Sequence, residues 1–184
     1  QHKQVVLTMP FSENTNLIKE YIDYGISEVM LSKYWEGLDA LKSKIKISRS
    51  IVLHHSSEEP IDERFDGVII PYKKAMDIEW LKENSKKFEL TAIINHSCLA
   101  KCPAQKYKET MSFKIINGQQ YKQPRSASCF KYIGTTSSML PREIVSRLSN
   151  YISRYKLIER ASEPALYINF LNYYIYNEPF HSKH

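Results

Sequence analysis

The stretch that decides the fold is Phe88-Glu89-Leu90-Thr91-Ala92-Ile93-Ile94-Asn95. Its apolar run is short and nearly continuous, which is typical of a strand covered on both faces. Comparable runs come earlier in the chain, separated by polar amphipathic stretches; they occupy residues 5–9, 28–31, 47–54 and 67–70. Strands that alternate with helical patterns predict βαβ units and a parallel sheet. We expect the strands to be neighbours in sequence order, because right-handed crossovers place successive strands side by side.

Helical patterns lie between and after these strands. The first runs from an N-cap at Ser12 to Tyr24, where Gly25 ends it. Pro141 is suited to the first turn of a later helix that we expect to reach Tyr155. The other predicted helices cover residues 35–44, 76–84 and 163–176, and a further strand is predicted at 156–158.

Five or six strands are too few for a complete barrel, because an eight-fold (β/α) barrel takes about 250 residues and this chain has 184. The predicted fold class is therefore α/β, a parallel-stranded, incomplete TIM-barrel-like domain. We expect one domain over 1–184, with βα repeats in 1–97, a cysteine-bearing excursion in 98–140 and helices in 141–184. An open sheet edge must be covered, either by the helix at 163–176 or by a second chain, which would make a homodimer or another protein complex.

Composition and charge limit the compartments and partners that we expect for this chain. No apolar run is long enough to span a membrane, and no signal-peptide core follows Gln1. Because the first residue is not methionine, we expect a fragment or a trimmed chain. The odd count of three cysteines argues against a disulfide scaffold and favours the reducing cytoplasm. The net charge of +6 fits either a lysine-rich solvated surface or binding to RNA or another anionic partner.

All three cysteines stand beyond the strand at 88–95. Cys98 and Cys102 form a Cys-x3-Cys-Pro segment, and Cys129 follows later. Thiolates are soft ligands that suit zinc, copper(I) and iron–sulfur clusters, so we expect the three side chains to converge on one metal site. His96 is a candidate fourth ligand, as in a Cys3His zinc site; without it, three thiolates would leave one iron of a cluster open. The alternative is that the cysteines are small buried apolar residues.

The segment Ile93-Ile94-Asn95-His96-Ser97-Cys98-Leu99-Ala100-Lys101-Cys102-Pro103 resembles the strand–Asn-x-x-Cys-x3-Cys-Pro segment of the bacterial collagenase-like peptidase superfamily. That superfamily includes proteins of tRNA hydroxylation and of oxygen-independent ubiquinone hydroxylation. Looser matches follow at 128–130, 139–144 and 155–160, where Glu159 replaces a family glycine. The resemblance implies a barrel-like domain and a [4Fe-4S] cluster on Cys98, Cys102 and Cys129. Family members with a four-cysteine site have one ligand more than this chain.

Other polar residues have both a functional and a structural interpretation. Asn95 could orient a ligand or cap its strand, and Arg49 and Arg125 could bind an anionic substrate bidentately or form surface ion pairs. Adjacent His54 and His55 point to opposite faces of a strand, which argues against a shared metal. The remaining pair is acidic: Asp77 and Glu79 could supply acid–base chemistry, whereas the structural interpretation makes Asp77 the N-cap or a first-turn acid of a helix.

Two functions remain open from the sequence. The first is an iron–sulfur enzyme of redox, hydroxylation or RNA and small-molecule modification. The second is a non-catalytic module, stabilised by zinc or serving as a partner subunit. Phosphate loops, His-Glu-x-x-His and Gly-x-Ser-x-Gly are absent from the sequence, so kinase, zinc-protease and serine-hydrolase chemistry have no support. No acid–base pair for proteolysis is evident.

Overall fold

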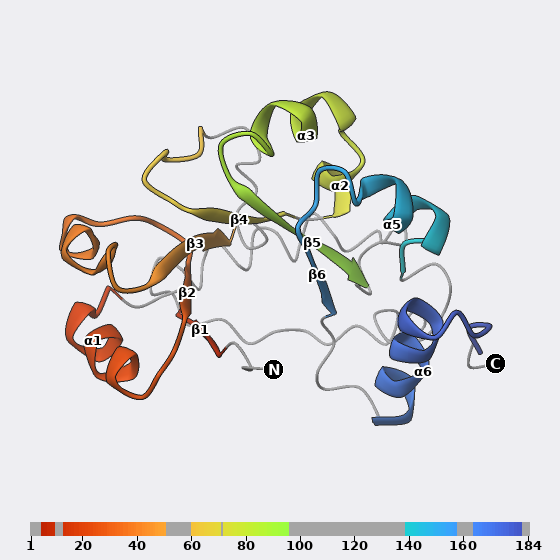
Figure 1. Ribbon diagram of the computed structural model, residues 1–184, viewed down its shortest axis with the longest axis horizontal. Helices are drawn as coiled ribbons and strands as arrows, with labels where there is room; N and C mark the ends of the chain where they lie inside the picture. Colours follow the sequence, from red (N-terminus) through yellow and green to blue (C-terminus); the bar gives the residue numbers. More distant parts are fainter. Residues whose placement is uncertain are drawn as a thin grey trace, which may run out of the picture.

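A computed structural model describes residues 5–9, 13–50, 60–70, 72–95, 139–157 and 164–181. Within these residues, six strands form a single sheet in the order β1-β2-β3-β4-β5-β6, and every neighbouring pair is parallel (Figure 1). The elements in chain order are β1 (Val6–Thr8), α1 (Thr15–Asp23), β2 (Glu28–Leu31), the 3-10 helix η1 (Glu36–Leu41), β3 (Lys46–Ser50), β4 (Gly67–Ile70), α2 (Tyr72–Ala75), α3 (Ile78–Asn84), β5 (Glu89–Asn95), α5 (Arg142–Leu148), β6 (Arg154–Leu157) and α6 (Pro164–Ile175).

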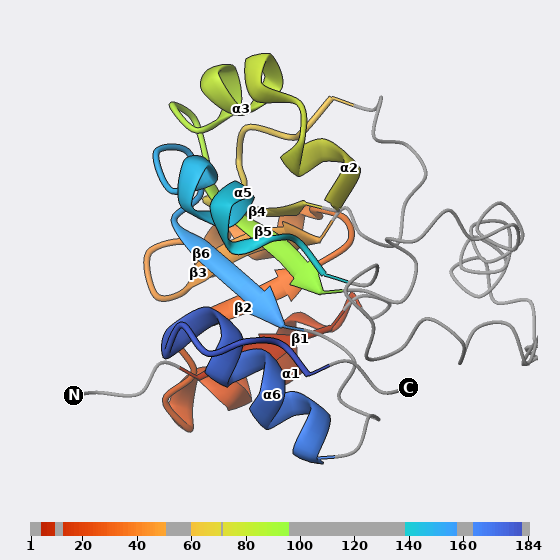
Figure 2. The ribbon, with the colours of Figure 1, turned by 90° about the vertical axis from the view of Figure 1, so that its right-hand side faces the viewer.

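The sheet curls into half a barrel with the helices outside it (Figure 1). The strand order confirms the predicted parallel arrangement and the incomplete, TIM-barrel-like α/β class. The arrowheads of β2, β5 and β6 point towards the same side in Figure 2, so the carboxyl ends of these strands lie at one edge of the half-barrel. No described helix is both long and apolar enough to cross a membrane.

The outer face of the sheet is apolar and packs against the helices. Beneath α1 and η1, it contributes Val29, Leu31 and Ile47 to a buried cluster that also holds Ile18 of α1. A second cluster lies on the strands from β4 onward, and its buried members are Val68, Ile70, Ala75, Leu81, Phe88, Leu90, Ala92, Ile94, Leu140, Leu148 and Ile152. Burial on this face follows the alternation of side chains along each strand.

The inner face is mixed. Three apolar side chains, Met30, Ile69 and Ile93, form a small buried cluster there. Polar and charged residues occupy other positions on the same face, and register pairs Thr91 of β5 with Arg154 of β6. The inner face therefore combines polar and charged residues with a small apolar cluster.

The helix limits differ from the predicted ones in detail. Asn14, not Ser12, caps α1: its side chain accepts a hydrogen bond from the backbone N–H of Leu17 at 3.0 Å. Gly25 ends that helix as predicted, with φ of +87°, a left-handed conformation that costs glycine no Cβ clash. Asp77 caps α3, accepting from the backbone N–H of Trp80 at 3.1 Å, which confirms its structural interpretation.

The predicted helix from Pro141 to Tyr155 is wrong beyond its first two turns. Pro141 is the N-cap, α5 ends at Leu148, and β6 begins at Arg154. Neither proline nor glycine follows Leu148 to mark the end of the helix, because the next residues are Ser149 and Asn150, so the helical pattern of the sequence continues past it. Pairing with β5 decides the conformation of Arg154 and Tyr155 instead.

Helix α6 covers the sheet near its β6 edge, as predicted for the helix at 163–176. Its buried Leu166 and Phe170 form one cluster with Met139, and Leu157 of β6 packs against it. The hydroxyl of Tyr167 donates to the backbone carbonyl of Leu157 at 3.2 Å. One side of the half-barrel is thus closed by the chain itself, and the homodimer or partner chain stays a prediction.

Candidate functional site

The predicted metal ligands follow β5, whose carboxyl end the structure describes in detail. Asn95, the last residue of β5, is fully buried. Cys98, Cys102, Cys129, His96 and Arg125 lie outside the described residues, as do His54 and His55. The structure therefore shows the place where the cysteine-bearing segment leaves the sheet and the place where it returns.

The chain leaves and re-enters the sheet at the same point. Asn95 and Met139 form an isolated antiparallel bridge, and the backbone N–H of Leu140 donates to the carbonyl of Ile94 at 2.8 Å. We call these four residues, Ile94, Asn95, Met139 and Leu140, the neck. Residues 96–138, which contain all three cysteines, begin and end at it.

The pairing of β5 with β6 shifts register beside the neck. Ile93 pairs with Lys156 and Asn95 with Leu157, so Ile94 is an extra residue on β5. Such a bulge bends a strand and re-aims its side chains, and bulges are frequent next to functional sites. The end of β5 is therefore shaped differently from the regular strand before it.

Helix α6 fastens the neck from outside. The hydroxyl oxygen of Tyr174 lies 2.7 Å from the carbonyl oxygen of Leu140 and 3.1 Å from that of Ile94. Burial, with a smaller effect from Tyr173, raises the pKa of Tyr174 well above its ordinary value. The hydroxyl is therefore protonated and shares its single hydrogen between two carbonyls.

Arg142 joins α5 to α6 on the same side. Its guanidinium lies 4.3 Å from the centre of the Tyr173 ring, and its backbone N–H donates to the Tyr173 hydroxyl at 3.2 Å. Nη1 of Arg142 also donates to the Asn177 side chain. These contacts hold α5, the segment that follows the neck, against α6.

Arg49 lies on β3 and not at the end of β5. It shares its face of β3 with Ile47, the outer face, where it is buried, and its Nη1 donates to the carbonyl of Pro60 at 3.1 Å. The structure thus gives Arg49 a partner within the chain, on the face opposite the inner cluster. Substrate binding by Arg49 stays a prediction.

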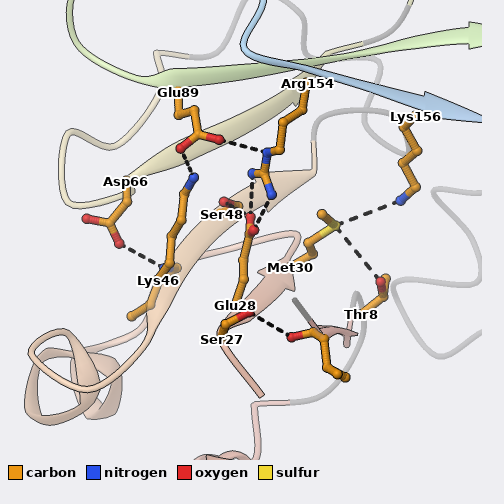
Figure 3. Close-up of polar contacts among 12 residues, drawn as sticks. Thr8, Ser27, Glu28, Met30, Lys46, Ser48, Asp66, Glu89, Arg154 and Lys156 are labelled. Atoms are coloured by element: carbon orange, nitrogen blue, oxygen red, sulfur yellow. Dashed lines mark hydrogen bonds and ion pairs between the residues drawn. The ribbon is translucent and has the colours of Figure 1, made fainter. Parts of the chain in front are cut away.

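An ion network on the inner face was not predicted from the sequence (Figure 3). Arg154 of β6 lies between two carboxylates, with Nη2 2.9 Å from Glu28 Oε1 and Nε 2.7 Å from Glu89 Oε1. Ser48 donates to Glu28, and Lys46 pairs with Glu89. Each of the four charged residues begins its strand, and this shared position was the available signal.

This network lies at the amino end of the strands and spans the half-barrel. Glu28 and Arg154 belong to β2 and β6, which have three strands between them. Four spacings of a flat sheet come to about 19 Å, farther than these two side chains can reach towards each other. The ion pair therefore requires the curl of the sheet and helps to hold it.

The electrostatics of Glu28 agree with a structural role. Burial raises the pKa of its carboxyl, but hydrogen bonds from Arg154 and Ser48 outweigh that effect, and the pKa is lowered from 4.5. The carboxylate is ionised and paired. At the amino end of barrel strands, such groups contribute stability rather than catalysis.

Towards the carboxyl end, the inner face becomes less charged. Lys156 extends across from β6 to β2, with its Nζ 3.8 Å from Met30 Sδ, and Thr8 of β1 approaches the same sulfur at 4.0 Å (Figure 3). Among the described residues, no group of three or more histidine, cysteine or acidic side chains could hold a metal ion. A metal site with three or more ligands of these kinds would therefore need at least one residue beyond the described ranges.

Comparisons with protein-family models, with curated proteins and with solved structures found no match for this chain.

Proposed function

We propose that this chain binds a [4Fe-4S] cluster through Cys98, Cys102 and Cys129, at the carboxyl end of β5, and acts in a redox or hydroxylation reaction. The observation that carries the proposal is the neck. Because Asn95 and Met139 are bridged, both ends of the cysteine-bearing segment start from one point of the sheet. Cys98 is three residues from that point and Cys129 ten, within reach of a common centre.

The position supports a functional site on general grounds. Loops that follow the carboxyl ends of parallel strands carry the chemistry of barrel folds, and β5 is an inner strand of the sheet. Three thiolates suit three irons of a cluster. When bound, the cluster would supply electron transfer or an open iron for a ligand; the chain would supply the thiolates and, through buried Asn95, an amide beside them.

Two residues are candidates for binding the substrate. The sequence offers Arg125, near Cys129, as a bidentate group for RNA or another anionic substrate. Asn95 stays the second candidate, because it ends the strand from which the cysteine segment leaves. The alternative function is a non-catalytic module with zinc on the same thiolates and His96, a donor set that zinc accepts.

Anaerobic purification tests the proposal. We expect a brown protein with a broad visible absorption band, and iron and sulfide in equal amounts, about four of each per chain. Cys98→Ser, Cys102→Ser and Cys129→Ser should each abolish the band, whereas the neighbouring Ser97→Ala and Ser128→Ala should keep it.

Two other results would redirect or end the proposal. A colourless protein with one zinc per chain, lost in His96→Ala, would establish the zinc module instead. Protein that holds neither iron nor zinc after anaerobic purification and reconstitution with ferrous iron and sulfide would refute both forms.

A further inference from the structure

We infer that Tyr174 is a positioning residue for the cysteine site: its hydroxyl locks the neck and so keeps the two ends of the ligand-bearing segment together. The inference rests on the proposed function and adds to it a residue from α6, far from the cysteines in sequence. Figure 1 shows α6 beside α5 and the end of β5, outside the curled sheet.

The contacts at the neck are specific to the hydroxyl. Leu140 accepts from Tyr174 through its carbonyl and donates through its N–H to the carbonyl of Ile94, which also faces the hydroxyl. One side-chain oxygen therefore binds both strands of the neck at once. Its raised pKa, caused mainly by burial, keeps it a donor throughout the ordinary pH range.

The ring of Tyr174 has a separate role. It packs against the buried cluster on the strands from β4 onward, and its centre lies 5.0 Å from that of the Tyr173 ring. Met139 is buried against Leu166 and Phe170 of the same helix. Phenylalanine at 174 would keep this packing and remove only the hydrogen bonds, which makes the substitution a selective probe of the lock.

The physical consequence concerns loop closure. A metal site built from a long segment pays the entropy of bringing its ligands together, and a joined neck removes part of that cost before any metal binds. Ligands held by well-supported elements also bind more tightly than ligands left loose. Removing the lock should therefore speed metal loss, even where the fold persists.

The chain offers a matched control. Tyr155, on β6, donates its hydroxyl to the backbone carbonyl of Val145 at 2.8 Å, and burial raises its pKa as well. Tyr155→Phe removes the same kind of bond away from the neck. Comparing it with Tyr174→Phe separates an effect on the neck from the general loss of one buried hydrogen bond.

The experiment uses the full chain, purified anaerobically, as wild type, Tyr174→Phe and Tyr155→Phe. Iron and zinc per chain are measured first, and the release of bound metal to an excess of chelator is then followed in time. In parallel, amide hydrogen exchange is measured at Leu140. Tyr174→Phe should release metal about fivefold faster and raise Leu140 exchange about fivefold, the equivalent of one ordinary hydrogen bond; Tyr155→Phe should change neither.

The outcomes separate this inference from the function on which it rests. Metal release and Leu140 exchange that match in the two variants would overturn the role of Tyr174 and leave the cysteine site standing. Wild-type protein without iron or zinc would overturn the proposed function, and the positioning role with it. Faster exchange at all core amides in Tyr174→Phe would show general destabilisation and would also refute the lock.

Discussion

The two ends of the half-barrel are fastened by different forces. At the amino end, charged side chains meet on the inner face, and Arg154 pairs with Glu28 across the curl (Figure 3). At the carboxyl end, main-chain carbonyls of the neck accept from Leu140 and from Tyr174. The ion pairs at the amino end therefore help to hold the curl of the sheet, whereas the hydrogen bonds at the carboxyl end join the two points where one long segment leaves and re-enters it.

This difference predicts a separation of stability from metal binding. Substitutions in the ion network should lower the free energy of unfolding and leave the metal content of folded protein unchanged. Substitutions that weaken the neck should instead speed the loss of bound metal and leave the free energy of unfolding of the whole chain nearly unchanged.

The largest effect is expected for Arg154→Met. It leaves Glu28, whose side chain is 3% exposed, as a buried charge without its main partner, and breaking such a pair costs about 3 kcal/mol or more. Chemical denaturation should show this loss. Arg64→Met, which removes an exposed pair with Asp62, should cost much less, because exposed ion pairs contribute little to stability. Equal losses of stability in the two variants would show that the ion network stabilises the fold no more than an exposed ion pair does.

Gly67→Ala comes next. Gly67 lies between β3 and β5 on the inner face, and a Cβ there would stand 2.6 Å from Ser48 Oγ and 3.0 Å from the Glu89 carbonyl oxygen. Over-packing of this kind should lower the free energy of unfolding by about 2 kcal/mol. Gly25→Ala provides the comparison, because it has strained backbone but open space, and should cost about 1 kcal/mol. An unchanged free energy of unfolding in Gly67→Ala would show that the neighbouring groups can shift to accept a Cβ.

Acid should weaken the amino end through Glu28. Its pKa is lower in the folded chain than the ordinary 4.5, so the folded state binds fewer protons than the unfolded state. The stabilisation is thus complete above pH 4.5 and is lost as the pH falls through the lowered pKa. Unfolding measured between pH 6 and pH 3 should show a smaller decline in Glu28→Gln than in wild type. Parallel curves would exclude Glu28 as a source of acid sensitivity.

The smallest effect is expected for Arg142→Lys at the carboxyl side. Lysine keeps the charge but loses the planar group that lies over the Tyr173 ring and bonds to Asn177. Global unfolding should change by about 0.5 kcal/mol, within the range of an exposed cation–π contact, with faster amide exchange confined to α5 and α6. A loss as large as that of Arg154→Met would end the distinction between the two ends.

The sequence alone determined the class of fold and the order of the strands. Residues 28–31, 67–70 and 88–95 are short apolar runs, and such runs separated by connecting segments form parallel neighbours because right-handed crossovers leave few alternatives. Local chemistry also predicted the N-cap at Asp77 and the glycine after α1. These features depend on residues close in the sequence.

Tertiary structure decided the rest. Nothing local shows that Arg154 meets Glu28, or that Tyr174 bonds to Ile94, because these partners are 126 and 80 residues apart. The start of β6 within a helical pattern was likewise set by β5. The cysteines could be found from sequence by their spacing, whereas the neck that joins the ends of their segment exists only once α6 and the curled sheet bring distant backbone groups within hydrogen-bonding distance.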